Sequence, residues 1–267
     1  MFLMGFVCNP LYWWLLLKMS VGGYIMQINT PQIDSYFSDI PKSEIQSIIE
    51  NKTRLGILKK GNSKLGKKIW DFSLPPVSSC PDSTKCAITC YAVKSYELYK
   101  DAKLSWNNNF KLVINDLDAF KTLVINQLSK GKIKTLRIHA SGDFYSMEYL
   151  TAWLEIINQF PDINFFAYTK AFQGSDLKQP KNLNIIDSFV EVDGIKYLNY
   201  AEYHIIKRIR QETKSIICPV TKGGYLKKLH RKNKDSAQYQ KGIKLSKITC
   251  SECEFCITKT QVLFIEH

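Results

Sequence analysis

Cysteines are the first residues in this chain whose type and spacing could do chemistry. The candidate metal ligands are Cys80, Cys86, Cys90, Cys218, Cys250, Cys253 and Cys256. The first three lie within eleven residues, and the last three form a C-x2-C-x2-C run. Thiolates at such spacings converge on iron–sulfur clusters or on structural zinc. Neither motif contains a histidine, and the first set would leave one iron open. The pattern therefore favours one or two [4Fe-4S] clusters.

Zinc is the alternative metal, because four thiolates also satisfy a tetrahedral zinc site. In that interpretation the cysteine groups hold a loop and a tail together without chemistry, and a single cluster built from both groups would do the same. The remaining thiol, Cys8, belongs to neither group. A disulfide framework is less favoured, because no convincing secretion signal precedes these residues and thiols stay reduced in the cytoplasm. We therefore expect a cytoplasmic protein.

A second candidate for chemistry is the polar segment around His139. His139, Ser141 and Asp143 come at the end of one expected strand, and Lys170 follows the next. A histidine in that position can act as an acid, a base or a hydrogen-bond donor near neutral pH. Arg137 is two residues before His139, so the two side chains are expected to share one face of the strand. The plainer alternative is that Asp143 caps a turn and His139 is a buried structural residue.

The elements that must position these residues alternate between strands and helices. Strands are expected at 69–74, 135–140, 163–168, 183–191 and 215–220, and helices at 42–51, 91–115, 117–128 and from Ser146 to Pro161. This order predicts an α/β fold with parallel strands and right-handed crossover helices. Ligands of such folds, open or barrel-shaped, lie at the carboxyl ends of the strands. The first cysteine set and the polar segment both follow such ends.

The composition of the sequence divides the chain into four regions. They are an apolar segment at 1–29, a basic arm at 30–68, an α/β domain at 69–220 and a basic, cysteine-rich metal segment at 221–267. The apolar run in the first region is shorter than the roughly 20 residues of a spanning helix. We expect no stable membrane span there, and interpret the region as a weak anchor or as sequence upstream of a later start at Met19 or Met26.

The charge of the chain points to a polyanionic partner. With 37 basic and 24 acidic residues the net charge is +13. The segment 52–68 has seven basic residues and no acidic one, and the segment 204–249 has thirteen basic residues against two acidic ones. Either could contact the phosphates of nucleic acid, although a solvated surface is the plain alternative.

Several motifs resemble the phage "gene product 88" family. They are Gly61–Lys67, Phe72–Pro75, the loop from Cys80 to Ala92, Ile138–Tyr145 and Phe166–Lys170, within a match from about Gly61 to Cys256. The resemblance implies a phage, plasmid or other mobile-element setting and a cysteine-bound metal. The family is more distantly similar to radical S-adenosylmethionine enzymes, which implies a partial TIM-like barrel with a [4Fe-4S] cluster after its first strand and S-adenosylmethionine as a candidate ligand. Those enzymes use C-x3-C-x2-C, whereas here the third thiol, Cys80, lies upstream.

The leading hypothesis is an iron–sulfur protein, an enzyme of redox or radical type acting on or near nucleic acid with an electron donor. Its catalytic pocket would be lined by His139, Ser141, Asp143 and Lys170. The alternative is a zinc-stabilised nucleic-acid-binding module without catalysis.

Overall fold

The computed structural model describes residues 34–61, 65–81, 87, 90–171, 179–192, 195–198, 200–201, 216–217 and 262–265. Its helices are α1 (Ser35–Ser38), α2 (Lys42–Leu55), α3 (Tyr91–Leu98), α4 (Lys100–Asn115), α5 (Leu117–Leu128) and α6 (Met147–Asn158). Its main strands are β1 (Lys59–Lys60), β2 (Ile69–Phe72), β3 (Thr135–Ile138), β4 (Asn164–Thr169) and β5 (Leu183–Asp187). No helix within these residues is long and apolar enough to cross a membrane.

The main sheet has the order β1-β2-β3-β4-β5. Strands β2 to β5 are parallel, and β1 pairs with β2 in the antiparallel direction. Because β2 to β5 run in the same direction, all their carboxyl ends meet at one edge of the sheet. The expected α/β class with parallel pairing is therefore confirmed for this part of the chain.

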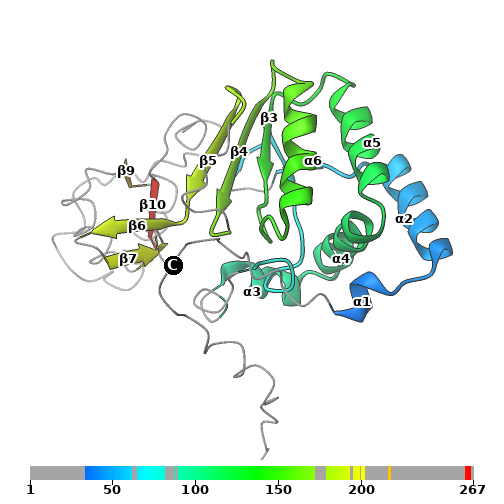
Figure 1. Cartoon of the computed structure of the whole chain (residues 1–267), viewed down its shortest axis with the longest axis horizontal. Helices are drawn as coiled ribbons and strands as arrows, with labels where there is room; N and C mark the ends of the chain where they lie inside the picture. Colours follow the sequence, from blue (N-terminus) through cyan, green and yellow to red (C-terminus); the bar gives the residue numbers. More distant parts are fainter. Residues whose placement is uncertain are drawn as a thin grey trace, which may run out of the picture.

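Helices α5 and α6 cover one face of the sheet. Figure 1 shows them side by side along β3 and β4, with α2 beyond α5. The sheet side chains beneath them are apolar and include Phe72, Ile138 and Ala167. The Phe72 ring lies 5.3 Å from that of Phe120 on α5 and 5.5 Å from that of Trp153 on α6. This aromatic packing lies in the core and holds β2 against α5 and α6.

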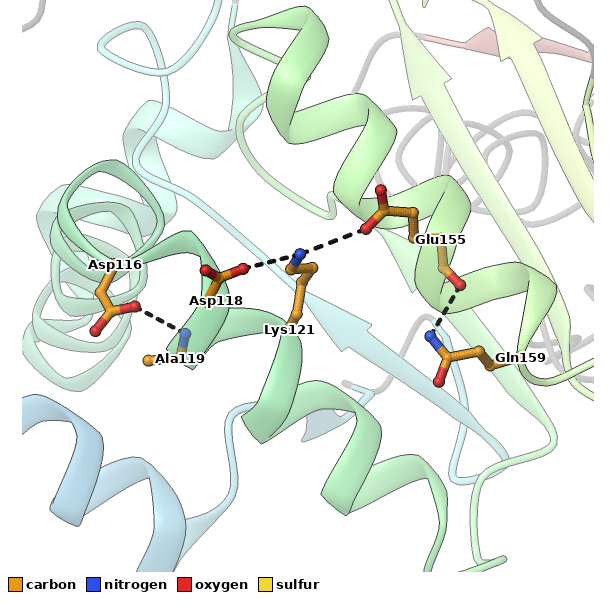
Figure 2. Close-up of polar contacts among 6 residues, drawn as sticks. All are labelled: Asp116, Asp118, Ala119, Lys121, Glu155 and Gln159. Carbon is orange, nitrogen blue, oxygen red and sulfur yellow. Dashed lines mark hydrogen bonds and ion pairs between the residues drawn. The ribbon is translucent and has the colours of Figure 1, made fainter.

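Local sequence sets where these two helices begin. The Ser146 hydroxyl accepts the Tyr149 amide at the start of α6, and the Asp116 carboxylate accepts the Ala119 amide at the start of α5. Such caps satisfy amides that have no partner within the helix. Figure 2 shows Lys121 of α5 between Asp118 of the same helix and Glu155 of α6. The Nζ–O distances are 2.9 Å to Asp118 and 3.4 Å to Glu155. These surface ion pairs add little stability, but the one between Lys121 and Glu155 marks the contact between the two helices.

Two buried lysines join α2 to α4 in different ways. Lys111 Nζ forms an ion pair with Glu44 at 2.7 Å. Lys52 Nζ instead donates to the carbonyl and hydroxyl of Ser105, at 3.3 and 3.2 Å. Within the described residues no carboxylate pairs with Lys52, and burial, aided by the charge of Lys59, lowers the pKa of Lys52 to about 7.

Most of the expected elements are confirmed, with shifted ends. The helix expected at 91–115 is divided at Tyr99 into α3 and α4, and the strand expected at 183–191 is divided at Ser188 into β5 and β6 (Phe189–Val192). β6 pairs with β7 (Ile195–Leu198) in a hairpin, and β8 (Tyr200–Ala201), β10 (Val262–Ile265) and β9 (Ile216–Ile217) form a small parallel sheet. The expected N-terminal segment and nearly all of the C-terminal metal segment lie outside the described residues.

Candidate functional site

The carboxyl edge of the parallel sheet gathers the polar residues expected from sequence. The loop toward Cys80 follows β2, the segment from His139 to Asp143 follows β3, and Lys170 follows β4. In Figure 1, α3 lies at this end of the strands. The structure therefore brings the two described ends of the first cysteine loop, at Cys80 and Cys90, to the same edge as the polar segment, as expected from the parallel strands.

Asp143 ties the end of β3 to the end of β4. Its Oδ1 accepts the Phe144 amide at 2.8 Å and the Thr169 hydroxyl at 2.7 Å, and its Oδ2 accepts the Lys170 amide at 2.9 Å. Burial raises the pKa of Asp143, while these three hydrogen bonds and the Lys170 charge act in the opposite direction. Since its oxygens serve the backbone and Thr169, Asp143 acts first as a clamp that positions Lys170.

His139 is buried on the helix side of the sheet. Its φ of 63° is left-handed, which is uncommon for a residue other than glycine, and ends β3 at Ile138. The ring lies 4.7 Å from Phe144, and Nε2 is hydrogen-bonded to the Tyr149 hydroxyl at 2.8 Å. The expectation that His139 shares a strand face with Arg137 is wrong, because the left-handed turn carries the ring to the side of α6.

The electrostatics of His139 make it a neutral group at physiological pH. Burial, aided by the nearby Arg137 charge, lowers the pKa of His139 to about 3. Its Nδ1 is buried and has no hydrogen-bond partner within the described residues. A neutral ring can hold a polar ligand or the fold, but it is a poor proton carrier near pH 7.

The turn at Ser141 and Gly142 packs against the loop that leads to Cys80. The Leu74 amide donates to the Ser141 carbonyl at 2.9 Å. Gly142 has a φ of 85°, and a Cβ there would come within 2.5 Å of Ser79 Oγ and 2.6 Å of Leu74 Cβ. Only glycine fits this approach. The Ser141 hydroxyl is buried, and its oxygen has no hydrogen-bond partner in the part of the chain that the structure describes.

Two of the seven predicted metal ligands lie within the described residues. Cys80 and Cys90 are both half-buried, and the Cys80 amide donates to the Val77 carbonyl at 3.0 Å. Val77 has a φ of 68°, a strained conformation for a β-branched residue. The other five ligands are Cys86, Cys218, Cys250, Cys253 and Cys256, which lie outside the described residues.

No group of three or more His, Cys, Asp or Glu that could hold a metal occurs among the described residues. The first cysteine set has its middle thiol outside them, and the second set lies wholly outside. Metal binding by the cysteines therefore stays a prediction.

The sequence interpretation missed a polar row on the sheet face opposite α5 and α6. Strand register aligns Lys59, Asp71 and Arg137 on β1 to β3, and continues through the buried Phe166 to Asn184 on β5. On β2 to β5 the aligned residues on either side of this row pack in or against the apolar core. The signal was present, because Asp71 and Arg137 each occupy the centre of a strand that is otherwise mostly apolar. Because side chains alternate along a strand, charged residues at such positions indicate a side of the strand that points away from the main apolar core.

Arg137 connects this row to the carboxyl edge of the sheet. Its Nε donates to the His139 carbonyl at 3.2 Å, and its Nη2 donates to the Tyr91 hydroxyl at 3.2 Å. The guanidinium carbon lies 5.0 Å from the centre of the Tyr168 ring. Arg137 thereby joins three segments at the carboxyl edge, namely the end of β3, the end of β4 and the first residue of α3.

Asp71 is the residue of this row best suited to proton exchange. Burial raises the pKa of Asp71 to about 6, against the lowering effects of the Ser73 hydroxyl and the Arg137 and Lys59 charges. The Ser73 hydroxyl donates to Asp71 Oδ2 at 3.1 Å. A carboxyl group with a pKa near 6 can both release and accept a proton near neutral pH.

The fold and site define an α/β protein with a polar carboxyl edge beside a cysteine-containing loop. A family model described as "Gene product 88" matches residues 56–259, and the chain belongs to this family. The expected resemblance to the gene product 88 family is confirmed.

Its relatives include two mycobacteriophage proteins. The "Gene 88 protein" of Mycobacterium phage D29 is 31% identical over 125 residues, which are 43% of this chain and 52% of the relative. The "Gene 88 protein" of Mycobacterium phage L5 is 35% identical over 103 residues, 34% of this chain and 43% of the relative. The chain thus spans about half the length of the curated relatives it matches, and no solved structure matches it.

Proposed function

We propose that this chain is an iron–sulfur protein of a phage or mobile element and works as a redox or radical-type enzyme. Cys80, Cys86 and Cys90 would hold a cluster with one accessible iron. Cys218, Cys250, Cys253 and Cys256 would hold a second, fully ligated cluster. The observation that carries the proposal is the position of the first cysteine loop: Cys80 follows β2, and Tyr91, next to Cys90, is hydrogen-bonded to the end of β3.

The donor set fits a cluster by its chemistry. All seven proposed ligands are thiols, which iron–sulfur centres prefer, and the two described ones are half-buried beside a polar edge. A bound cluster would supply electron transfer to a molecule held at its open iron. Zinc would accept the same thiolates, so elemental analysis rather than ligand type must decide between the metals.

The chain's own residues would divide the remaining work. Asp71 would exchange a proton with the substrate, because burial places its pKa at about 6. Arg137 would orient an anionic group and hold the polar face in place. His139 is neutral because burial lowers its pKa to about 3, and it would position the carboxyl edge together with Asp143. Lys170 and Ser141 are then the candidates for polar contacts with the substrate.

We extend this proposal to the fold. Parallel strands β2 to β5 in sequential order, with α5 and α6 on one face, are compatible with a partial TIM-like barrel whose inner side carries the polar row. A barrel of this kind would relate the chain to radical S-adenosylmethionine enzymes, with S-adenosylmethionine as a candidate ligand. Thermal stabilisation by added S-adenosylmethionine would support that relation, and no stabilisation of the metal-loaded protein would remove it.

The test is metal analysis of the full chain, purified without oxygen. We expect iron and acid-labile sulfide, with cluster signals in Mössbauer or EPR spectra. Replacing Cys80, Cys86 and Cys90 by alanine should lower the iron content by the iron of the first cluster. Replacing Cys250, Cys253 and Cys256 should lower it by the iron of the second. Cys8→Ala is the matched control and should leave the iron content unchanged. Protein that binds neither iron nor sulfide, even after reconstitution, rules the proposal out.

The second candidate, a zinc-stabilised nucleic-acid-binding module, is favoured by the net charge of +13. In the segment 52–68, Arg54, Lys59, Lys60, Lys67 and Lys68 are exposed, whereas Lys52 is buried and cannot contact phosphate. The segment 204–249 lies almost wholly outside the described residues. This candidate predicts zinc in the purified protein and nucleic-acid binding that weakens steeply with salt.

A further inference from the structure

The Tyr91 hydroxyl joins the cysteine loop to the carboxyl end of β3. It donates to the Ala140 carbonyl at 2.5 Å and accepts from Arg137 Nη2 at 3.2 Å. These partners lie 49 and 46 residues away in sequence. Tyr91 as a whole is 55% exposed, so the residue contributes little burial, and the hydroxyl makes the connection through its two hydrogen bonds.

Tyr91 directly follows Cys90, a proposed metal ligand. It is the first residue of α3, and the Cys90 carbonyl accepts the Val93 amide at 3.2 Å in the first turn. Any restraint on the Cys90 thiol therefore acts on Tyr91 through one peptide bond and a hydrogen-bonded helical turn.

The other end of the connection is the strained turn after β3. Arg137 Nε donates to the carbonyl of His139, the residue with a φ of 63°. Arg137 and Tyr91 thus bind the carbonyls of both His139 and Ala140. A left-handed histidine persists only where its surroundings stabilise it, and Arg137 and Tyr91 add to the contacts that the Tyr149 hydroxyl and the Phe144 ring make with His139.

We infer that Tyr91 is a positioning residue that transmits metal binding at Cys90 to Arg137 and to the turn at His139 and Ala140. The inference rests on the proposed metal at the first cysteine loop. Metal binding fixes Cys90, the Tyr91 hydroxyl is then held against Ala140, and Arg137 is fixed on the polar face beside Asp71. Without metal, the loop loosens and the guanidinium loses one of its anchors.

The test is hydrogen exchange of the full chain with and without bound iron, in the wild type and in Tyr91→Phe. The reporters are the His139 amide, which donates to the Phe72 carbonyl at 3.2 Å, and the Leu74 amide, which donates to the Ser141 carbonyl at 2.9 Å. Metal loading should slow exchange at both in the wild type. Tyr91→Phe should bind the same amount of iron but lose this metal-dependent slowing, by roughly tenfold in exchange rate for the lost hydrogen bonds.

Tyr99→Phe is the matched control, because Tyr99 is a 62% exposed tyrosine eight residues further on. It should behave as the wild type. Arg137→Gln removes the guanidinium from the other side and should reproduce the effect of Tyr91→Phe, which keeps the test decisive if one variant folds poorly. Equal metal-dependent protection in Tyr91→Phe and the wild type overturns the inference alone. A wild type that binds iron without any change at these amides overturns it too, whereas a wild type that binds no metal overturns the proposed function.

Discussion

Replacing the buried Lys52 by methionine should stabilise the protein at neutral pH. Lys52 is 4% exposed and donates only to Ser105 among the described residues. Burial lowers its pKa from 10.5 to about 7. At 1.36 kcal/mol per pH unit, this difference corresponds to a penalty of roughly 5 kcal/mol for the protonated form.

The sign of the pH dependence follows from proton counts. Between pH 7 and 10.5 the unfolded chain holds a proton on Lys52 that the folded chain does not. The free energy of unfolding therefore rises with pH across this window and is lowest below pH 7. Methionine removes the penalty but also two hydrogen bonds, each worth about 1 kcal/mol. We expect a net gain of about 2–3 kcal/mol at pH 7, which is a rise in Tm of about 4–10 °C for a chain of this size.

Urea denaturation at several pH values between 6 and 10, followed by circular dichroism, measures both effects. The wild type should gain stability from pH 7 to 10, and Lys52→Met should lack most of this gain. Lys111→Met is the control, because Lys111 has an ion-pair partner in Glu44 and its loss should destabilise the protein by about 1–3 kcal/mol. Parallel pH curves for wild type and Lys52→Met, or a Lys52→Met protein less stable than wild type at pH 7, would refute the reasoning.

Three further perturbations follow from the site. Asp71→Asn should flatten the pH dependence between 4 and 6: burial raises the pKa of Asp71 from 3.8 to about 6, so this group costs up to roughly 3 kcal/mol of stability as pH rises through that window. Denaturation at pH 4, 6 and 8 measures it, and an unchanged slope contradicts it. Asp143→Ala should cost about 2–4 kcal/mol, because three donors lose their acceptor, whereas Asp118→Ala, with a 91% exposed side chain, should stay within about 0.5 kcal/mol in the same thermal melts. Equal melting temperatures for the two variants would show that the Asp143 contacts contribute nothing. Gly142→Ala should destabilise by at least about 1 kcal/mol, because of its left-handed φ and its close approach to Ser79 and Leu74, whereas Gly131→Ala meets no atom within 4 Å and pays only for its φ of 70°. Similar losses for both would mean that the close approach is relieved without cost.

The sequence predicted the helices and the strand order better than the site. The Ser146 cap and the apolar spacing of α6 are local signals, and both are confirmed. The order of strands and helices was sufficient to place Cys80, Asp143 and Lys170 at one edge of the sheet. These features depend on short stretches of sequence and on a general rule of parallel sheets, so they could be read without coordinates.

The roles of the individual side chains could not be read in the same way. The strand period placed His139 beside Arg137, but a single left-handed residue moved its ring into the core. The connection from Tyr91 to Ala140 spans 49 residues, and the pKa of Asp71 depends on burial by distant segments. Such long-range relations leave no local pattern, although charged residues in the centres of apolar strands were a signal for Asp71 and Arg137.

The short antiparallel strand β1 has a consequence for how this sheet can grow. It consists of two exposed lysines at one border of the sheet, and such a border is a poor template for another strand. The other border of the described sheet is β5, which is parallel to β4 and has no lysine within Leu183–Asp187. Growth of the described sheet beyond β1 would require a new strand to pair beside two positively charged side chains, which disfavours an added strand at that border.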